Sequence, residues 1–253
     1  MSTVIARHKP SIAGMGFFQA MALLLLLLTL VGFAPTFFLR PWFQTMSLPF
    51  RLHVHGLFST AWIMVLVTQT LLVASGRLAW HRRMGLFAIA MAGALVISGL
   101  AILYALAAGY PENGWILAEA SAVIWGNIAS LTTFCIFVVT GIALRKNAQT
   151  HKRMMLLATL SIMGPPLARI SRFDAFRVSD IMVINEAAYV LGGMLVLYAL
   201  ILIHDFRTLG RPHTTLLWGI PLQMGLLFAA ALGVAGTEFG QRLVLTLSGS
   251  APF

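Results

Sequence analysis

The sequence predicts an all-α, polytopic membrane protein: one bundle of about seven transmembrane helices, with the N-terminus in the cytoplasm and the C-terminus outside. Three observations lead to this fold class. The 253 residues are 59% hydrophobic and only 9% charged, with a mean hydropathy of +0.90, whereas about a quarter of the residues in a soluble domain are charged. The apolar residues form runs long enough to cross a bilayer. Only short charged clusters separate these runs, so we expect a single membrane domain over residues 1–253.

Seven runs reach the length of about 20 mostly apolar residues that a membrane-spanning helix needs. The expected spans are residues 16–39, 54–75, 84–108, 116–144, 154–172, 181–204 and 215–236. The first follows a polar start that resembles a secretory signal, but the run is too long for one, so we expect an uncleaved anchor. The second, fourth and sixth are apolar over most of their length and carry ionisable residues near one end, and the third is among the clearest.

The fifth and seventh spans have features that predict irregular helices. Pro165 and Pro166 remove two backbone donors from the fifth span and should kink or break it. The apolar run of the seventh span continues to Leu247. This predicts either a long, tilted helix or a short interfacial segment after it.

Basic residues predict the orientation. With the N-terminus inside, 11 of the 17 Lys and Arg residues lie on the cytoplasmic side, and six of the seven acidic residues lie outside. This distribution follows the positive-inside rule. It also accounts for the net charge of +10, so we expect no nucleic acid as a partner. The expected location is a bacterial inner (cytoplasmic) membrane, with the lipid bilayer as the main partner and other membrane-protein subunits as further partners.

An outer cluster of ionisable residues is a candidate metal site, because a charged side chain at membrane depth is costly and points to function. Helical spacing places His55 at the head of a polar stripe that ends at Gln69. The candidate ligands are His53, His55, Glu119 and Glu186, with Arg169 as the counter-charge. Two imidazoles with carboxylates suit zinc, copper or iron. The alternative is a structural network in which Arg169 pairs with one of the glutamates.

An inner cluster is a candidate haem site. Three histidines lie at the cytoplasmic ends of different spans: His81, His151 and His204. Two of them can serve as axial ligands of a b-type haem, with Lys152 and neighbouring arginines pairing the propionates. The alternative is that these histidines lie at the membrane interface and complement helix ends. Asp205 is expected to orient His204 or to pair with Arg207.

Gln69 and two segments of the chain together carry a resemblance to known proteins. The segments are Gly76-Arg77 with His81-Arg82-Arg83-Met84-Gly85, and His151-Lys152-Arg153-Met154-Met155 through Arg169. They resemble the HRxxG and HxRxM…R signatures of a group of uncharacterised bacterial multi-span membrane proteins, a group with no assigned activity. A fainter similarity to transmembrane cytochromes b, in which histidines on different helices ligate haem, implies haem binding here.

These observations favour a membrane-embedded metal- or haem-binding protein with a redox or metal-handling role. The short loops also allow a non-catalytic accessory subunit of a larger membrane complex. A third alternative is a transporter for small solutes or lipids that uses the polar stripe and a hinge at Pro165 and Pro166.

Overall fold

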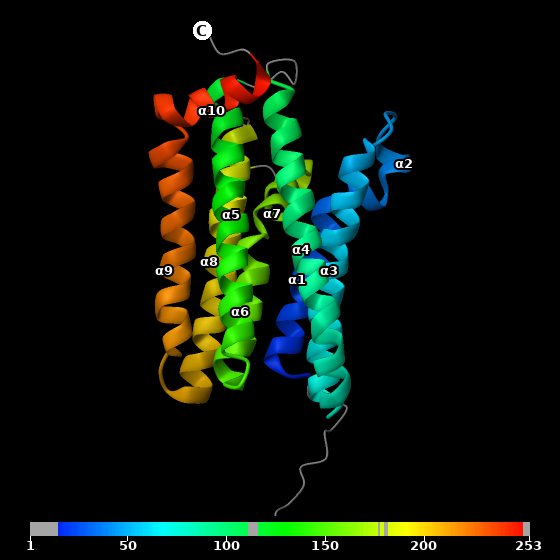
Figure 1. Ribbon diagram of the computed structural model, residues 1–253, viewed down its shortest axis with the longest axis vertical. Coiled ribbons are helices and arrows are strands. Elements are labelled where there is room, and N and C mark those ends of the chain that lie inside the picture. Colours follow the sequence, from blue (N-terminus) through cyan, green and yellow to red (C-terminus); the bar gives the residue numbers. More distant parts are fainter. Residues whose placement is uncertain (1–14, 111–115, 177, 180–181, 250–253) are drawn as a thin grey trace, which may run out of the picture.

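The protein is a bundle of long, roughly parallel or antiparallel helices (Figure 1). The computed structural model describes residues 15–110, 116–176, 178–179 and 182–249. The elements in chain order are α1 (Phe17–Phe33), the π-helical η1 (Ala34–Phe38), α2 (Arg40–Phe43), α3 (Phe50–Ala74), α4 (Leu78–Ala108), α5 (Leu117–Ala143), α6 (Ala148–Ser161), α7 (Gly164–Ile170), the 3-10 turn η2 (Asp174–Phe176), α8 (Met182–Leu209), α9 (Thr214–Phe228), the π-helical η3 (Ala229–Val234) and α10 (Glu238–Ser248). In these described parts, every regular element is helical, as the sequence predicts.

Six helices are long and apolar enough to cross a membrane, which confirms a polytopic helical membrane bundle. They cover Phe17–Phe38, Phe50–Ala74, Leu78–Ala108, Leu117–Ala143, Ile184–Leu209 and Thr214–Val234. The second and third begin earlier than their apolar runs, at Phe50 and Leu78 rather than at 54 and 84. Charged residues end an apolar run but not a helix, because long basic side chains extend toward water from a helical backbone.

The predicted fifth span, 154–172, is a broken helix. α6 ends at Ser161 and α7 begins at Gly164, with the two following one another through the bundle in Figure 1. Pro165 and Pro166 occupy the first turn of α7, where a missing N–H costs no helical hydrogen bond. The predicted break at these prolines is therefore confirmed. An irregular backbone at this depth is tolerated because protein surrounds it: α6 packs on α5 and α9, and α7 packs on α1 and α8.

Glycines bring α7 very close to both of its neighbours. A Cβ on Gly32 of α1 would lie 2.3 Å from the carbonyl oxygen of Pro166. A Cβ on Gly193 of α8 would lie 2.8 Å from a methyl group of Leu167. Small residues at such contacts permit the close packing that holds helices together in lipid, where burial away from water supplies little force.

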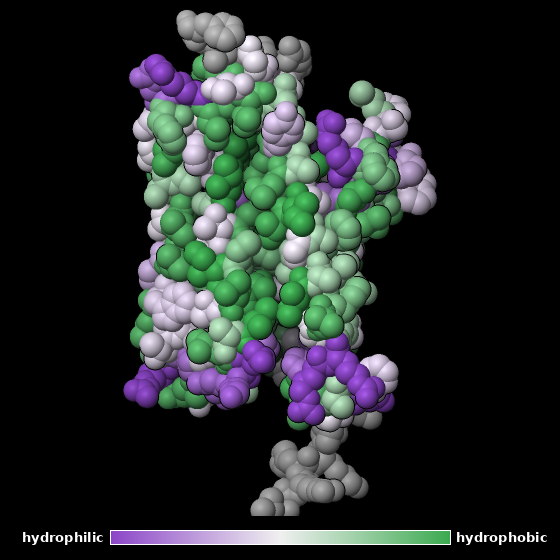
Figure 2. All heavy atoms as spheres, viewed as in Figure 1, coloured by the Kyte–Doolittle hydropathy of each residue, from purple (hydrophilic) through white to green (hydrophobic). Residues whose placement is uncertain are grey.

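The outer surface has the zones expected of a membrane protein. Figure 2 shows a broad apolar band with hydrophilic residues gathered at the two ends of the bundle. At one end α10 lies across the other helices (Figure 1). Two hydrogen bonds attach α10 and the residues just before it to α5. The Ser121 hydroxyl donates to the Ala235 carbonyl at 2.9 Å, and the Trp125 indole donates to the Gly240 carbonyl at 3.1 Å. The residues after the seventh apolar run thus form a separate short helix, one of the two predicted outcomes.

Candidate functional site

Two of the three inner histidines meet at one end of the bundle. The rings of His81 and His151 have centroids 6.2 Å apart and planes at 83°. His81 lies in the first turn of α4 and His151 in the first turn of α6. Both are half-buried. Since α4 packs mainly on α3 and α5, and α6 mainly on α5 and α9, the side chains rather than the two backbones make this contact.

Local sequence fixes the position of His151. Asn147 caps α6, its side-chain oxygen accepting hydrogen bonds from the backbone N–H groups of Gln149 and Thr150, each at 3.1 Å. This cap sets the first turn of the helix. His151 Nδ1 lies 2.8 Å from the carbonyl oxygen of Gly141 in α5. A carbonyl can only accept, so Nδ1 carries the proton and Nε2 keeps a free lone pair.

One ring nitrogen of His81 has no partner in the described structure, although the ring lies next to the backbone of Gln69. This nitrogen, Nδ1, is buried and makes no hydrogen bond within the described structure. The side-chain oxygen of Gln69, in the neighbouring helix α3, is also buried and unbonded. Buried polar atoms normally have partners because desolvation is costly. An imidazole nitrogen left in this state next to a second imidazole is suited to bind a ligand.

His204, the third inner histidine, packs elsewhere. Its ring stacks on Phe17 of α1 with a centroid distance of 4.0 Å and an interplanar angle of 6°, and it meets Phe18 edge-on at 5.6 Å. The ammonium group of Lys152 lies 4.4 Å from the centre of the Phe18 ring. His204 and Lys152 thus both contact α1, and the structure brings together only His81 and His151.

The inner end also contains a fully buried ion pair. Arg153 of α6 and Asp205 of α8 are 1% and 0% exposed. Arg153 donates to both carboxylate oxygens, with Nε 2.9 Å from Oδ2, and Nη1 donates to the Gln149 carbonyl at 3.0 Å. Asp205 therefore pairs with Arg153 rather than with Arg207. The sequence places both residues in the inner cluster but does not indicate that they are partners.

The loop between α8 and α9 connects to this ion pair through His213. The His213 backbone N–H donates to Asp205 Oδ2 at 3.0 Å. Its ring Nδ1 accepts from the Thr215 N–H at 3.2 Å and so caps α9. Burial and the nearby charge of Arg153 lower the pKa of His213 from its ordinary value of 6.5. The neutral ring that the cap requires is therefore the favoured form.

The outer histidines have separate surroundings. His53 is exposed, with its ring 6.2 Å from that of Phe37. His55 is half-buried, with Nδ1 3.0 Å from the Ser98 hydroxyl and Nε2 3.4 Å from the Ser59 hydroxyl. Hydroxyl contacts on both ring nitrogens satisfy His55 without a metal ion.

The remaining outer candidates do not converge on these histidines. Glu186 pairs with Arg172 at 2.8 Å, and Glu119 is half-buried in the first turn of α5. Arg169 lies over the Phe33 ring at 4.5 Å, donates to the Pro165 carbonyl at 3.2 Å and has a buried Nε without a partner. In the parts of the chain that the structure describes, no three His, Cys, Asp or Glu residues form a group that could hold a metal ion.

The chain matches no protein-family model, no curated protein and no solved structure. A proposal for its function depends on the side chains themselves. Among the residues singled out by sequence, His81 and His151 are the two histidines that the fold brings into mutual contact.

Proposed function

We propose that the protein binds a haem or a transition-metal ion through His81 and His151, and that this centre serves a redox or metal-handling role within the membrane. The observation that carries the proposal is the pair of imidazole rings with centroids 6.2 Å apart, contributed by two different helices. Both histidines lie in the two segments that carry the family resemblance.

The spacing fits two ligands of one metal centre. A metal–imidazole nitrogen bond is about 2.0–2.1 Å long, so two imidazoles on opposite sides of one ion have ring centroids roughly 6 Å apart. The Gly141 carbonyl holds His151 in the tautomer whose Nε2 is free. A hydrogen bond of this kind on the other ring nitrogen is what orients metal-bound histidines in general. His81 Nδ1, buried without a partner, is the available donor atom on the opposite ring.

Haem and a single ion place different demands on the surroundings. His81 belongs to the α3–α4 hairpin and His151 to the α5–α6 hairpin, so a haem held by both histidines would link the two hairpins. Exposed basic residues near this end, including Arg82 and Lys146, could pair with propionates. A single ion would use two imidazoles and complete its shell with water or substrate, because the described residues offer no third ligand of the usual types.

The same proposal includes a topology. Counting α6 and α7 together as one crossing gives seven, with the N-terminus on the cytoplasmic side of a bacterial inner membrane. The turns at 75–77, 144–147 and 210–213 then share the cytoplasmic end with the histidine pair. Their basic residues are exposed there, as the positive-inside rule requires: Arg77, Arg145, Lys146 and Arg211.

An absorption spectrum and a metal analysis of the detergent-purified protein, produced with haem precursor and transition metals supplied, test the proposal. We expect a Soret band for haem, or about one equivalent of a transition metal. His81→Ala and His151→Ala should each abolish the signal. His204→Ala, at the same end, and the exposed His53→Ala should retain it. A wild-type protein without haem or metal, or a signal that survives both substitutions, would refute the proposal.

A further inference from the structure

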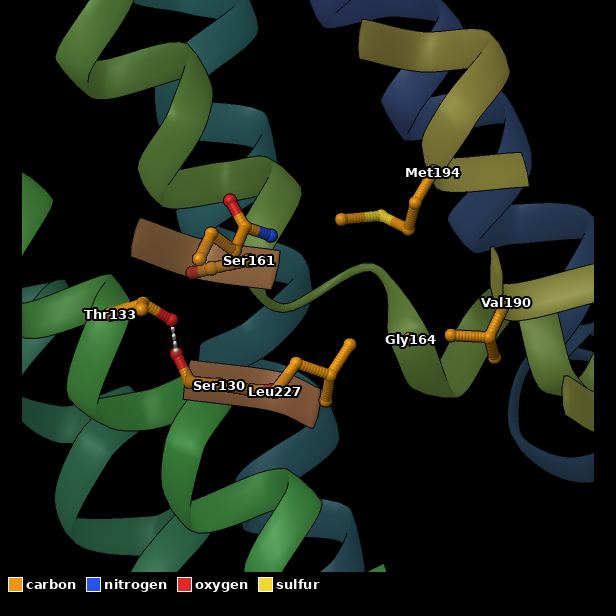
Figure 3. Close-up of a pocket in the computed structure, with 8 residues that line it drawn as sticks. Ser130, Thr133, Ser161, Gly164, Val190, Met194 and Leu227 are labelled. Carbon is orange, nitrogen blue, oxygen red and sulfur yellow. Dashed lines mark hydrogen bonds between the residues drawn. The ribbon is translucent and has the colours of Figure 1, made fainter. Parts of the chain in front are cut away.

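The break between α6 and α7 leaves a small cavity inside the bundle (Figure 3). Its volume is about 30 Å³, whereas one water molecule needs at least about 10–15 Å³. The lining is mainly apolar and includes three hydroxyl groups that donate hydrogen bonds to carbonyls of their own helices: Ser130, Thr133 and Ser161. This cavity has room for water but not for a larger ligand.

A much larger hollow, the hairpin groove, lies on the surface of the α3–α4 hairpin near the turn that joins the two helices. Its volume is about 420 Å³, within the range of about 300–1,000 Å³ that is usual for ligand sites. Residues of both helices line it: Thr68 and Leu72 of α3, and Trp80, Arg83 and Met84 of α4. Because Trp80 and Arg83 are exposed, the groove is open to the surroundings of the bundle.

Apolar side chains supply much of this lining. Leu72 and Met84 are half-buried in the groove, and the Thr68 hydroxyl donates its proton to a carbonyl of its own helix at 2.8 Å. One turn further along α4, on the same face as Arg83, the side chain of Phe87 is 51% exposed. Such an exposed apolar surface on a membrane-spanning helix contacts lipid. A molecule that fills the groove therefore needs an apolar part.

Arg83 gives the groove a positive charge at the end near the turn. Side chains of an α-helix lean toward its N-terminus, and the Arg83 guanidinium lies over the Trp80 ring, 5.5 Å from the ring centre. Tryptophan is enriched at the level of the lipid head groups. The guanidinium therefore lies where a head group is expected, beside the apolar part of the lining.

The hairpin itself has no negative charge to complement Arg83. Residues 50–108 include no Asp or Glu, whereas Arg77, Arg82 and Arg83 are exposed beside the turn. Figure 2 shows hydrophilic residues gathered at this end of the hairpin. Asp205, at the same end of the bundle, is fully buried against Arg153, and the other ion pairs of the described structure lie on α8 and α10. An anion that complements the groove has to come from another molecule.

We propose that the hairpin groove binds one anionic phospholipid, with its phosphate on Arg83 and an acyl chain against Leu72 and Met84. A phosphate accepts two parallel hydrogen bonds from one guanidinium. Basic pockets between membrane-spanning helices bind anionic lipid head groups for the same reason. The three exposed arginines beside the turn favour a lipid with net negative charge over a zwitterionic one. The groove shares no lining residue with the histidine pair, so this site is independent of the proposed haem or metal centre.

Native mass spectrometry of the full-length protein, purified in detergent and freed of lipid, tests the site. Phosphatidylglycerol and phosphatidylcholine with identical acyl chains are titrated separately, and the fraction of lipid-bound protein gives each affinity. We expect one phosphatidylglycerol per chain, bound at least ten-fold more tightly than phosphatidylcholine. An excess of inorganic phosphate should not displace this lipid, because free phosphate lacks the apolar part that the groove contacts.

Two substitutions test the head-group and acyl-chain contacts separately. Arg83→Gln should lower the affinity for phosphatidylglycerol at least ten-fold. Its matched control is Arg82→Gln, which removes the same charge from the next residue of α4, exposed and outside the lining. Leu72→Trp fills the groove and should also lower the affinity at least ten-fold, whereas Leu71→Trp, at an exposed position outside the lining, should not. If Arg83→Gln does not fold, Leu72→Trp and its control decide the test.

Equal affinities for the two lipids, or no bound phosphatidylglycerol, would overturn the proposal. Equal losses in Arg83→Gln and Arg82→Gln would overturn it as well, because they would assign binding to the general charge of the hairpin. Unchanged binding in Leu72→Trp, or displacement of the lipid by phosphate, would rule out the acyl-chain contact. His151→Ala, which changes the histidine pair but not the groove, should bind phosphatidylglycerol like the wild type, and this result separates the lipid site from the haem or metal centre.

Discussion

Removing one member of the buried Arg153–Asp205 pair should destabilise the protein severely. In Asp205→Ala, Arg153 loses the carboxylate to which its guanidinium donates, while remaining 1% exposed in the wild-type packing. It retains two hydrogen bonds to Gln149, from Nη1 to the backbone carbonyl and the side-chain oxygen, and its position over the Phe18 ring, 5.8 Å from the ring centre. The backbone N–H of His213 loses its acceptor at the same time.

The expected loss is about 3–5 kcal/mol of unfolding free energy, the range for leaving a buried charge without its partner. Most of this loss comes from leaving the Arg153 guanidinium buried without its partner, rather than from the net stabilisation that the ion pair provides. Replacing both residues, as in Arg153→Met with Asp205→Leu, removes both charges and should recover most of the loss. The double variant should therefore be more stable than Asp205→Ala, contrary to simple addition of the two changes.

Unfolding in detergent micelles titrated with a denaturing detergent, followed by far-ultraviolet circular dichroism, measures these differences. Glu238→Ala is the control: it breaks the Arg242–Glu238 pair of α10, whose side chains are 73% and 78% exposed. An exposed pair contributes at most about 1 kcal/mol. The reasoning fails if Asp205→Ala costs no more than Glu238→Ala, or if the double variant is the least stable of the set.

Two further predictions concern helix packing and capping. Gly32→Ala should lower the unfolding free energy by about 1–3 kcal/mol through overpacking, because the new Cβ would lie 2.3 Å from the Pro166 carbonyl oxygen. Gly93→Ala, with no atom within 4 Å of its Cβ, should leave the unfolding free energy unchanged in the same assay. Equal effects of the two substitutions would contradict the close α1–α7 contact. Because the pKa of His213 lies below 6.5 in the folded protein, the unfolded chain binds the proton more readily, so stability should fall as pH drops from 7 through 6.5 toward the lower folded value. The loss reflects the cap on the Thr215 N–H. His213→Asn, which keeps a cap without a titrating ring, should therefore reduce this pH dependence, and a variant with the wild-type profile would assign it to another group.

Much of the architecture follows from local composition. A bilayer accepts only segments whose backbone bonds are satisfied internally, so the length of an apolar run is enough to identify a helix. The proline pair at 165–166 predicts the break for an equally local reason, the absence of two N–H donors. The helix starts at Phe50 and Leu78 are harder to predict from the sequence, because each helical backbone extends beyond its apolar run into residues that hydropathy assigns to a loop.

The candidate site was only partly accessible from sequence. The sequence singles out three inner histidines and favours His204 among them, whereas the fold brings His81 and His151 together and stacks His204 on Phe17. The cavity at the helix break was not foreseen. Its serine and threonine residues donate hydrogen bonds to carbonyls of their own helices, so nothing in the local sequence marks them as the lining of one cavity.

The bilayer imposes its demands residue by residue along the chain, so hydropathy and charge alone establish a helical membrane bundle and indicate which end holds its basic clusters. Partnerships across the bundle depend on how helices rotate and cross, which is settled by side-chain packing at contacts such as Gly32 against Pro166. Arg153 contacts Asp205, which lies 52 residues away in the sequence. His81 of α4 contacts His151 of α6. Only the packed bundle brings such distant groups into contact, because no local preference of the chain encodes the rotation of one helix against another.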